Sequence, residues 1–223
     1  MASRRGPYRV GQRWRARIVE VAARELATAG YDGLVLAEVA DKAGLSASAL
    51  QHYFPTRRHL LAAVAEQRLA AIGETWPRAD DVQDVHELFE NAAAAIATMS
   101  REPGLVELAV RVATDAIDPE SPAHEWARTQ YASVVESNAA TFAACAARGE
   151  LRDGVDPELA SRALQAVADG LQLQWAVSGR AIDLAATSAR AISELGRAII
   201  APAHLDEARL ARLAAGRSAD QPA

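Results

Sequence analysis

The sequence has little of what secreted and membrane proteins need. It contains one cysteine, Cys145, which cannot form an internal disulfide, so we expect a cytoplasmic protein. No run of eighteen uncharged apolar residues occurs, which argues against a membrane span. The basic residues after Met1 are not followed by an apolar stretch and a small-residue cleavage site, so we expect no signal peptide.

Patterns of catalytic and metal-binding residues are also missing. The five histidines are scattered, and His86 with Glu87 and Glu90 comes nearest to a ligand set, although an exposed helix face explains that trio better. We find no nucleophile with a neighbouring base and no glycine-rich phosphate loop. The expectation is a protein without metal or cofactor, and an α-helical enzyme is a remote alternative.

Charge is distributed unevenly along the chain. Residues 1–60 carry a formal charge of +5, whereas residues 61–223 carry −10. A basic segment suits a partner that presents phosphates, and an acidic remainder suits a body that points away from them. The two segments are therefore expected to face different partners, although solvated surface alone could explain either one.

The periodicity of apolar residues predicts an all-α protein. Alanine, leucine, arginine and glutamate dominate, and apolar residues recur at intervals of three and four. Prolines and glycines mark the breaks. We expect helices over about 12–28, 36–43, 46–53, 57–73, 82–100, 105–116, 122–148, 157–178, 184–200 and 205–214.

The first three of these helices have the spacing of a helix-turn-helix. Gly44 separates the second helix from the third, and Ser46 is a suitable N-cap for the third. This predicts a basic arm over 1–12 and a DNA-binding domain over 13–73, with the motif at about 35–54. A second helical domain is expected over 74–215, and a disordered tail over 216–223.

The expected helix over 157–178 is apolar on two faces, so it must be covered on both sides. Its small-residue face and a matching row on the next helix favour a four-helix interface in a homodimer, with core helices of a monomer as the alternative. The predicted interface residues are Ala163, Ala166, Gly170, Leu173, Val177, Ala189, Ile192, Gly196 and Ile199.

The stretch from Arg17 to Leu61 resembles the DNA-binding domain of the TetR/AcrR family of bacterial transcriptional regulators. The matching residues keep the family's spacing without gaps and include Gly30-Tyr31, Ala43-Gly44-Leu45-Ser46 and Tyr53-Phe54-Pro55. Asp169-Gly170-Leu171 followed by Trp175 also looks like the penultimate helix of many members. The resemblance implies a repressor that binds palindromic operator DNA as a homodimer and is released by a small apolar ligand.

Residues for DNA contact follow from the expected third helix and from the resemblance. Gln51 suits the edge of an adenine, and Ala47 or Ala49 suits a thymine methyl group. By resemblance, Tyr53 and Arg57 hold phosphates, and the helix that starts near Leu36 points its N-terminus at the backbone. The full predicted set is Arg4, Arg5, Leu36, Ser46, Ala47, Ser48, Ala49, Gln51, His52, Tyr53 and Arg57.

The arm and the ends of the motif carry further expectations. Arg4, Arg5 and Arg9 lie in a segment with glycine and proline, which could enter a minor groove or form a solvated tail. Many family members have threonines where this chain has Val35 and Leu36, and a tyrosine where it has Gln51. We expect these departures to change which operator is read.

Ligand sensing follows from the resemblance alone. The helices over 82–148 are expected to line the pocket, with Phe89, Met99, Arg111, Trp126, Tyr131 and Phe142 as candidate contacts. A regulator without a ligand, an activator and a dimerisation scaffold that no longer reads DNA are the alternatives.

Overall fold

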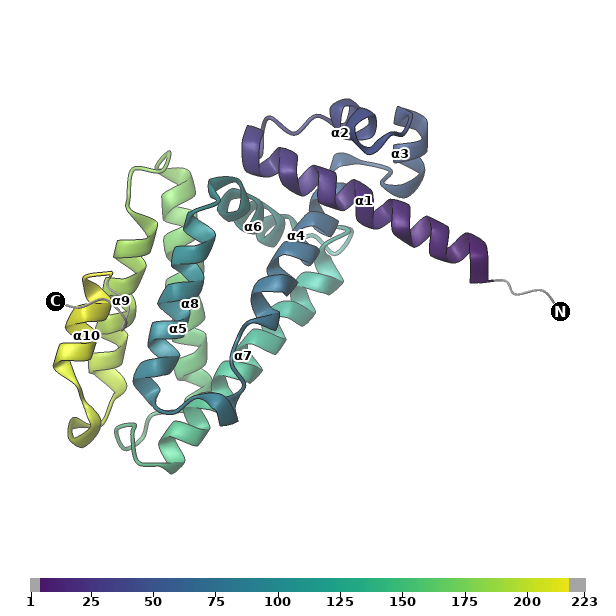
Figure 1. Ribbon diagram of the computed structural model, residues 1–223. Coiled ribbons are helices and arrows are strands. Elements are labelled where there is room, and N and C mark those ends of the chain that lie inside the picture. Colours follow the sequence, from purple (N-terminus) through teal and green to yellow (C-terminus); the bar gives the residue numbers. More distant parts are fainter. Residues whose placement is uncertain (1–4, 217–223) are drawn as a thin grey trace. The chain divides into compact units, whose positions relative to one another are not determined.

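A computed structural model describes residues 5–216 of the chain, with side chains from Val10 onward (Figure 1). The all-α prediction is confirmed, because this part of the chain forms ten α-helices, two short 3-10 helices and no strand. Leu151 and Ile200 form one isolated antiparallel bridge. The tail predicted over 216–223 lies outside the described residues from 217 on.

The α-helices lie close to the predicted ranges. They are α1 (Arg5–Ala29), α2 (Leu36–Ala43), α3 (Ala47–Tyr53), α4 (Arg57–Glu74), α5 (Val85–Ser100), α6 (Pro103–Asp115), α7 (His124–Ala147), α8 (Pro157–Val177), α9 (Leu184–Ile199) and α10 (Glu207–Ala214). The 3-10 helices, Ala79–Asp81 and Pro202–His204, precede α5 and α10. None of the described helices combines the length and the apolar character that crossing a membrane requires.

The largest difference from the predicted ranges is the start of α1. The segment predicted as an arm over 1–12 is helical from Arg5 onward, so the expectation of a separate arm was wrong for residues 5–12. Gly6 and Pro7 suggested an irregular segment, but both lie in the first helical turn. Proline is tolerated there because its missing N–H has no intrahelical partner in any case.

The helices divide into two units, each with its own core. The N-terminal unit comprises residues 1–73 and 102–127, and the C-terminal unit comprises residues 74–101 and 128–223. The domain boundary predicted from the sequence lay at residue 73, with 102–127 in the second domain. The structure instead places α6 and the segment after it in the unit that contains α1, α2 and α3.

The position of α6 has a local cause. Its second residue is Gly104, where a Cβ atom would stand 2.5 Å from the backbone oxygen of Leu26 in α1. Only glycine allows this approach. Ion pairs also tie α4 to the same segment: Arg58 lies 2.7 Å from Asp115, and Arg68 pairs with Glu102. Residues 102–127 therefore belong with the first helices of the chain.

In the C-terminal unit, α9 is the central helix and packs against α5, α8 and α10. Ile192 of α9 is fully buried, and Ser193 donates to the backbone oxygen of Leu210. A buried carboxylate fixes the start of α5: Glu150 accepts from the Val85 amide at 2.8 Å and from Arg148 at 2.5 Å. Burial alone would raise the pKa of Glu150, but these hydrogen bonds lower it.

Candidate nucleic-acid interface

The turn between α2 and α3 has the backbone of a helix-turn-helix. Gly44 ends α2 with a φ of +78°, a left-handed conformation that glycine adopts without strain. The amides of Gly44 and Leu45 donate to the oxygens of Asp41 and Ala40, at 3.0 and 2.9 Å. Ser46 then caps α3 by accepting from the Ala49 amide at 3.2 Å, as predicted. The angle between the two short helices is therefore fixed by local hydrogen bonds.

One face of α3 is buried and the other is open. Leu50 is 1% exposed, and Val39 and Ala43 of α2, the helix that packs against α3, are buried as well. Among the residues predicted to contact DNA, Ser46, Ala47, Ser48, Gln51 and His52 are exposed, and Leu36, Ala49 and Tyr53 are half-buried. The Ser46 and Ser48 hydroxyl oxygens are 3.0 Å apart, and the His52 and Tyr53 rings meet edge to face. The structure thus presents short polar side chains on a single helical surface.

Arg57, predicted to hold a phosphate, has partners within the N-terminal unit. Its Nη2 donates to the backbone oxygen of Tyr31, and its Nε donates to that of Leu34 at 3.3 Å. Its guanidinium also lies 4.5 Å from the centroid of the Tyr31 ring. Arg111 of α6 lies 4.4 Å from the same centroid and 3.9 Å from Asp32. The loop before α2 is therefore held from both α4 and α6.

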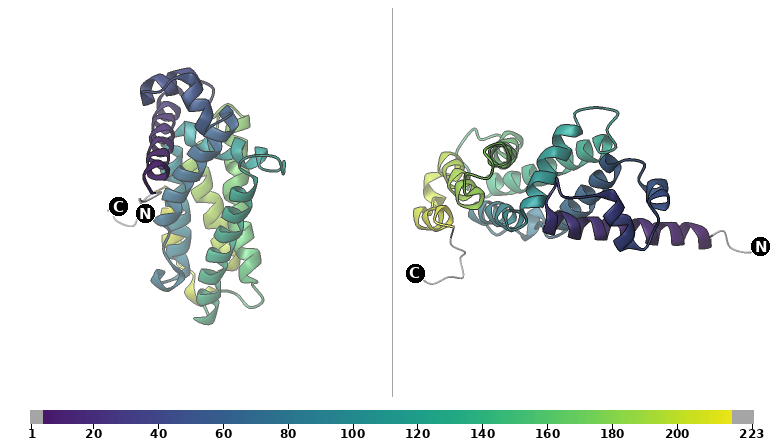
Figure 2. Two further views of the ribbon diagram at one scale, coloured as in Figure 1. Left: turned by 90° about the vertical axis from the view of Figure 1, so that its right-hand side faces the viewer. Right: turned by 90° about the horizontal axis from the view of Figure 1, so that it is seen from above.

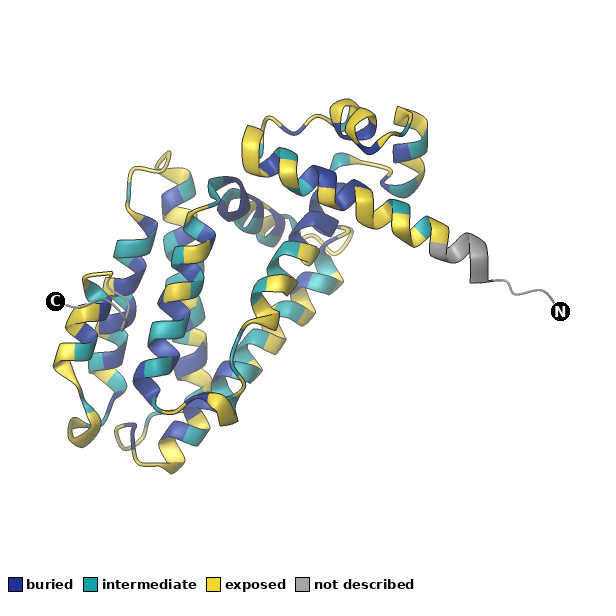
Figure 3. Cartoon of the chain, in the orientation of Figure 1, coloured by how far each residue is buried: buried dark blue, intermediate teal, exposed yellow. Residues whose placement is uncertain are grey.

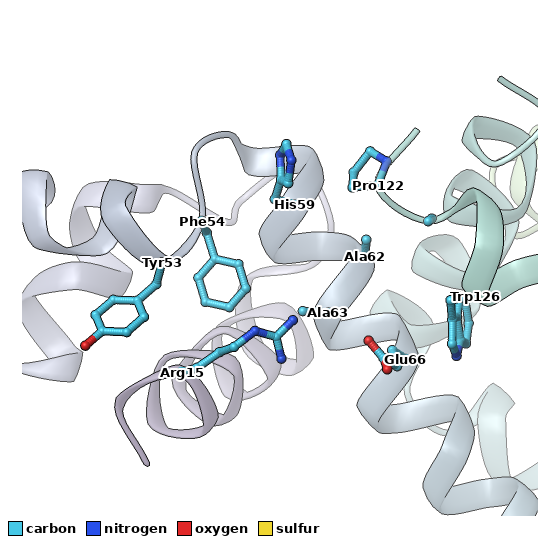
Figure 4. Close-up of a pocket in the computed structure, with 10 residues that line it drawn as sticks. Arg15, Tyr53, Phe54, His59, Ala62, Ala63, Glu66, Pro122 and Trp126 are labelled. Carbon is cyan, nitrogen blue, oxygen red and sulfur yellow. The ribbon is translucent and has the colours of Figure 1, made fainter. Parts of the chain in front are cut away.

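A small cavity of about 140 Å³ lies within the N-terminal unit, beside the recognition motif (Figure 4). Phe54, Ala62, Ala63 and Ala123 supply apolar lining, and Trp126 stands at one side. Arg15 of α1 approaches the Phe54 ring at 5.2 Å from its centroid. The remaining lining residues are Tyr53, His59, Glu66 and Pro122. The cavity therefore lies where α1, α3, α4 and the start of α7 meet.

The arginines predicted to reach DNA from an arm are placed differently from that expectation. Arg4 lies outside the described residues, while Arg5 and Arg9 belong to the backbone of α1. The segment is therefore helical at Arg5 and Arg9, and the contact of their side chains with a minor groove stays a prediction.

The residues predicted for a dimer interface separate into two groups. On α8, Ala166, Leu173 and Val177 are exposed and Ala163 and Gly170 are half-buried. On α9, Ala189 and Ile192 are 5% and 0% exposed, and Gly196 packs against Leu210 and Phe89. The prediction was wrong for Ala189, Ile192 and Gly196, because the protomer's own α5 and α10 cover that face. Ile199, at the end of α9, is half-buried.

The six predicted ligand contacts do not form one group. Phe89 and Phe142 are fully buried with ring centroids 5.9 Å apart, and Met99 is also buried in the C-terminal unit. Arg111 and Trp126 belong to the N-terminal unit, where they contact Tyr31 and line the cavity. Phe89 and Phe142 therefore pack as core.

The remaining candidate, Tyr131 of α7, lies beside a carboxyl group that the sequence analysis did not single out as functional. Tyr131 hydrogen-bonds Asp169 of α8, and Gln165 donates to Asp169 at 2.9 Å. Burial raises the pKa of Asp169, and burial together with Asp169 raises the pKa of Tyr131 to about 12. The apolar pattern of α8 could not reveal this group, since the pairing depends on α7 lying alongside.

Two family models match the chain, and together they cover more than half of it. The model of bacterial regulatory proteins of the tetR family matches residues 18–64, which contain α2, α3 and the turn between them. The model of the C-terminal part of BetI-type transcriptional repressors matches residues 116–201. No curated protein sequence matches the chain significantly.

Solved structures of similar fold include transcriptional regulators with 18–20% identity. SmeT, the repressor of the Stenotrophomonas maltophilia multidrug efflux pump SmeDEF, has a TM-score of 0.66 over 86% of this chain and 93% of its own, at 18% identity. A SmeT–triclosan complex has a TM-score of 0.68 over 87% and 95%, at 20% identity. A Saccharomonospora viridis regulator in complex with choline has a TM-score of 0.62 over 85% and 99%, also at 20%. At this identity the likeness concerns the fold.

Proposed function

Because the chain belongs to the TetR family of bacterial transcriptional regulators, we propose that it is a repressor that binds a palindromic operator as a homodimer. A small apolar ligand releases it. The observation that carries this proposal is the surface of α3, where exposed side chains of hydrogen-bonding type stand on a helix of fixed angle next to a basic α1. A helix of this kind fits the major groove, and the neighbouring cations fit phosphates.

The side chains of α3 divide by chemistry into base readers and backbone contacts. Gln51 reads an adenine through paired hydrogen bonds, and Ala47 or Ala49 contacts a thymine methyl group. Ser46, Ser48, His52 and Tyr53 hold phosphates or a base edge at the rim of the groove. The amides at the start of α2, near Leu36, attract a phosphate, since Val35 offers no side chain to cap them.

The exposed face of α8 supports the homodimer. Leu159 and Val177 are 66% and 78% exposed, and Ala166 and Leu173 lie between them on the same face. These residues recur at intervals of seven or four, so they form one apolar stripe along the helix. A second copy of the chain covers this stripe. The two α3 helices of the resulting dimer then reach half-sites about 34–36 Å apart.

Release by a ligand is supported by the family and by its structural neighbours. A structure of the repressor SmeT contains triclosan, and a regulator of the same fold contains choline. For this chain, Tyr131 is the candidate ligand contact, because Phe89, Phe142 and Met99 are buried in the core of the C-terminal unit. Arg111 and Trp126 belong to the N-terminal unit and act there on the helices that bind DNA. The ligand releases the protein from DNA only if it binds the DNA-free conformation more tightly than the DNA-bound one.

The experiment uses the full chain, purified from the cytoplasm of a bacterial host, and a duplex from the region upstream of its own gene. Fluorescence anisotropy should show binding to a palindromic segment with steep salt dependence. A thermal-shift screen of apolar and aromatic metabolites then supplies a ligand, which should weaken that binding. A hit that stabilises the protein without weakening the complex favours a regulator that is not released by ligand. Activated transcription of the adjacent gene in a reporter favours an activator.

A further inference from the structure

The first turns of the chain are unusually basic. Six arginines occur before Glu20, the first acidic residue, and four of them, Arg5, Arg9, Arg13 and Arg17, are spaced four residues apart. All four positions lie in one helix, because α1 runs without a break from Arg5. Residues four apart in an α-helix lie on the same face. The four arginines therefore occupy one stripe along α1.

This stripe lies on a part of α1 that has no buried side chain among its described residues. From Val10 to Arg17 every described side chain is exposed or half-buried, and burial begins only at Ile18 (Figure 3). The N-terminal half of the helix extends past α3 (Figures 1 and 2). The hydrophobic effect thus explains the second half of α1, whereas in the first half Arg15 lies against the Phe54 ring and no described side chain is buried.

The arginines of this half whose side chains the structure describes, Arg13, Arg15 and Arg17, also lack acidic partners. Among the ion pairs of the described residues, none involves Arg13, Arg15 or Arg17, whereas Arg24 of the same helix pairs with Glu20 at 3.1 Å. Like charges four residues apart repel one another in a helix, and cations near a helix N-terminus oppose its dipole. The sequence therefore places four cations where an isolated helix is least able to tolerate them, and an anionic partner would compensate.

We propose that the N-terminal half of α1 is a second DNA-contacting element, which lies as a helix along the phosphates that flank the half-site. The proposal rests on the proposed DNA-binding function. The stripe adjoins the recognition motif, because a Cβ atom at Gly44, in the turn before α3, would stand 3.9 Å from Arg17 Nη2. From Arg5 to Arg17 it spans roughly 18 Å, about five base-pair steps along the duplex. Each operator half-site is thus lengthened outward.

The test compares Arg9→Gln/Arg13→Gln with the wild-type full chain on two duplexes. One duplex ends at the palindrome, and the other carries roughly ten extra base pairs on each side, about one helical turn. Arg190→Gln/Arg212→Gln removes the same charge from exposed positions of the C-terminal unit and is the matched control. Anisotropy is measured over a range of salt concentrations, and circular dichroism checks that the helical content is unchanged.

The wild type and the control should bind the longer duplex more tightly than the short one, and Arg9→Gln/Arg13→Gln should lose most of this difference. Its salt slope on the longer duplex should fall by about one for each lost phosphate contact. Arg13→Lys, which keeps the charge, should retain the preference for the longer duplex. Equal affinity of the wild type for both duplexes, or an unchanged preference in the double variant, overturns the inference. If the wild type binds neither duplex, the proposed function itself fails.

Discussion

Arg57 holds Tyr31 in two ways: its guanidinium donates to the Tyr31 backbone oxygen and lies over the Tyr31 ring, 4.5 Å from the centroid. Arg111 reaches the same ring from α6. The loop that positions α2 is thus fastened to α4 and α6 within one unit. We infer that Arg57 positions the DNA-binding helices through this loop, and Arg111 connects the loop to α6.

Replacing Arg57 by alanine is therefore expected to act through the fold. The variant loses two hydrogen bonds from a charged donor, each worth about 1.5–3 kcal/mol when made in a protein, so the midpoint of unfolding should fall. DNA binding should weaken, while the salt slope should stay unchanged. Arg57→Lys should restore little of the lost stability and DNA affinity, because an ammonium group cannot reproduce the planar, forked set of donors of the guanidinium. A slope lower by about one would return Arg57 to the phosphate contacts.

Gln51→Ala tests the reading of bases by α3. Discrimination against the wrong base should fall by about 1–3 kcal/mol at one operator position, with an unchanged salt slope, because Gln51 carries no charge. Anisotropy with a set of single-base operator variants measures this. Gln67→Ala, at an exposed position on α4, is the control and should keep full discrimination. Equal weakening by Gln51→Ala on every operator would exclude base reading.

Leu173→Glu/Val177→Glu tests the apolar stripe of α8. Both side chains are exposed in the protomer, so the fold should persist, while two like charges from each subunit would meet across the interface. Light scattering after gel filtration should report a dimer for the wild type and a monomer for the variant. Ile117→Glu changes a residue that is 77% exposed in the N-terminal unit, and it should leave the dimer intact. A variant that stays dimeric would remove α8 from the interface.

Asp169→Asn tests the half-buried carboxyl next to Tyr131. Burial raises the pKa of Asp169 in the folded protein above its value in the unfolded chain, so ionisation costs stability as the pH rises through the folded pKa. Asparagine keeps the acceptor for Tyr131 and Gln165 but cannot ionise. Its Tm should exceed that of the wild type by a few degrees at neutral pH, and the difference should shrink as the pH falls toward the ordinary range of aspartate. A difference independent of pH would show that the ionisation of Asp169 does not set the stability of this pair.

Local chemistry made much of the fold predictable. Gly44 and Ser46 specify a left-handed turn and an N-cap whatever the rest of the chain does, and α2 and α3 accordingly have their predicted limits. The open face of α3 followed from the same pattern, because Val39, Ala43 and Leu50 had to face inward. Pro7 misled the prediction of α1, since proline breaks a helix only beyond the first turn.

The sequence by itself determined the all-α class, the recognition motif and the charge of the first helix, because helical periodicity, caps and charge are properties of neighbouring residues. Tertiary structure alone decided that α6 joins the DNA-binding unit, that Arg57 and Arg111 meet at Tyr31, and that α9 turns its small residues toward α5 and α10. Each of these depends on which helix covers which face. An apolar stripe requires a partner without specifying it, so only the packed molecule shows whether α5, α10 or a second chain fills that place.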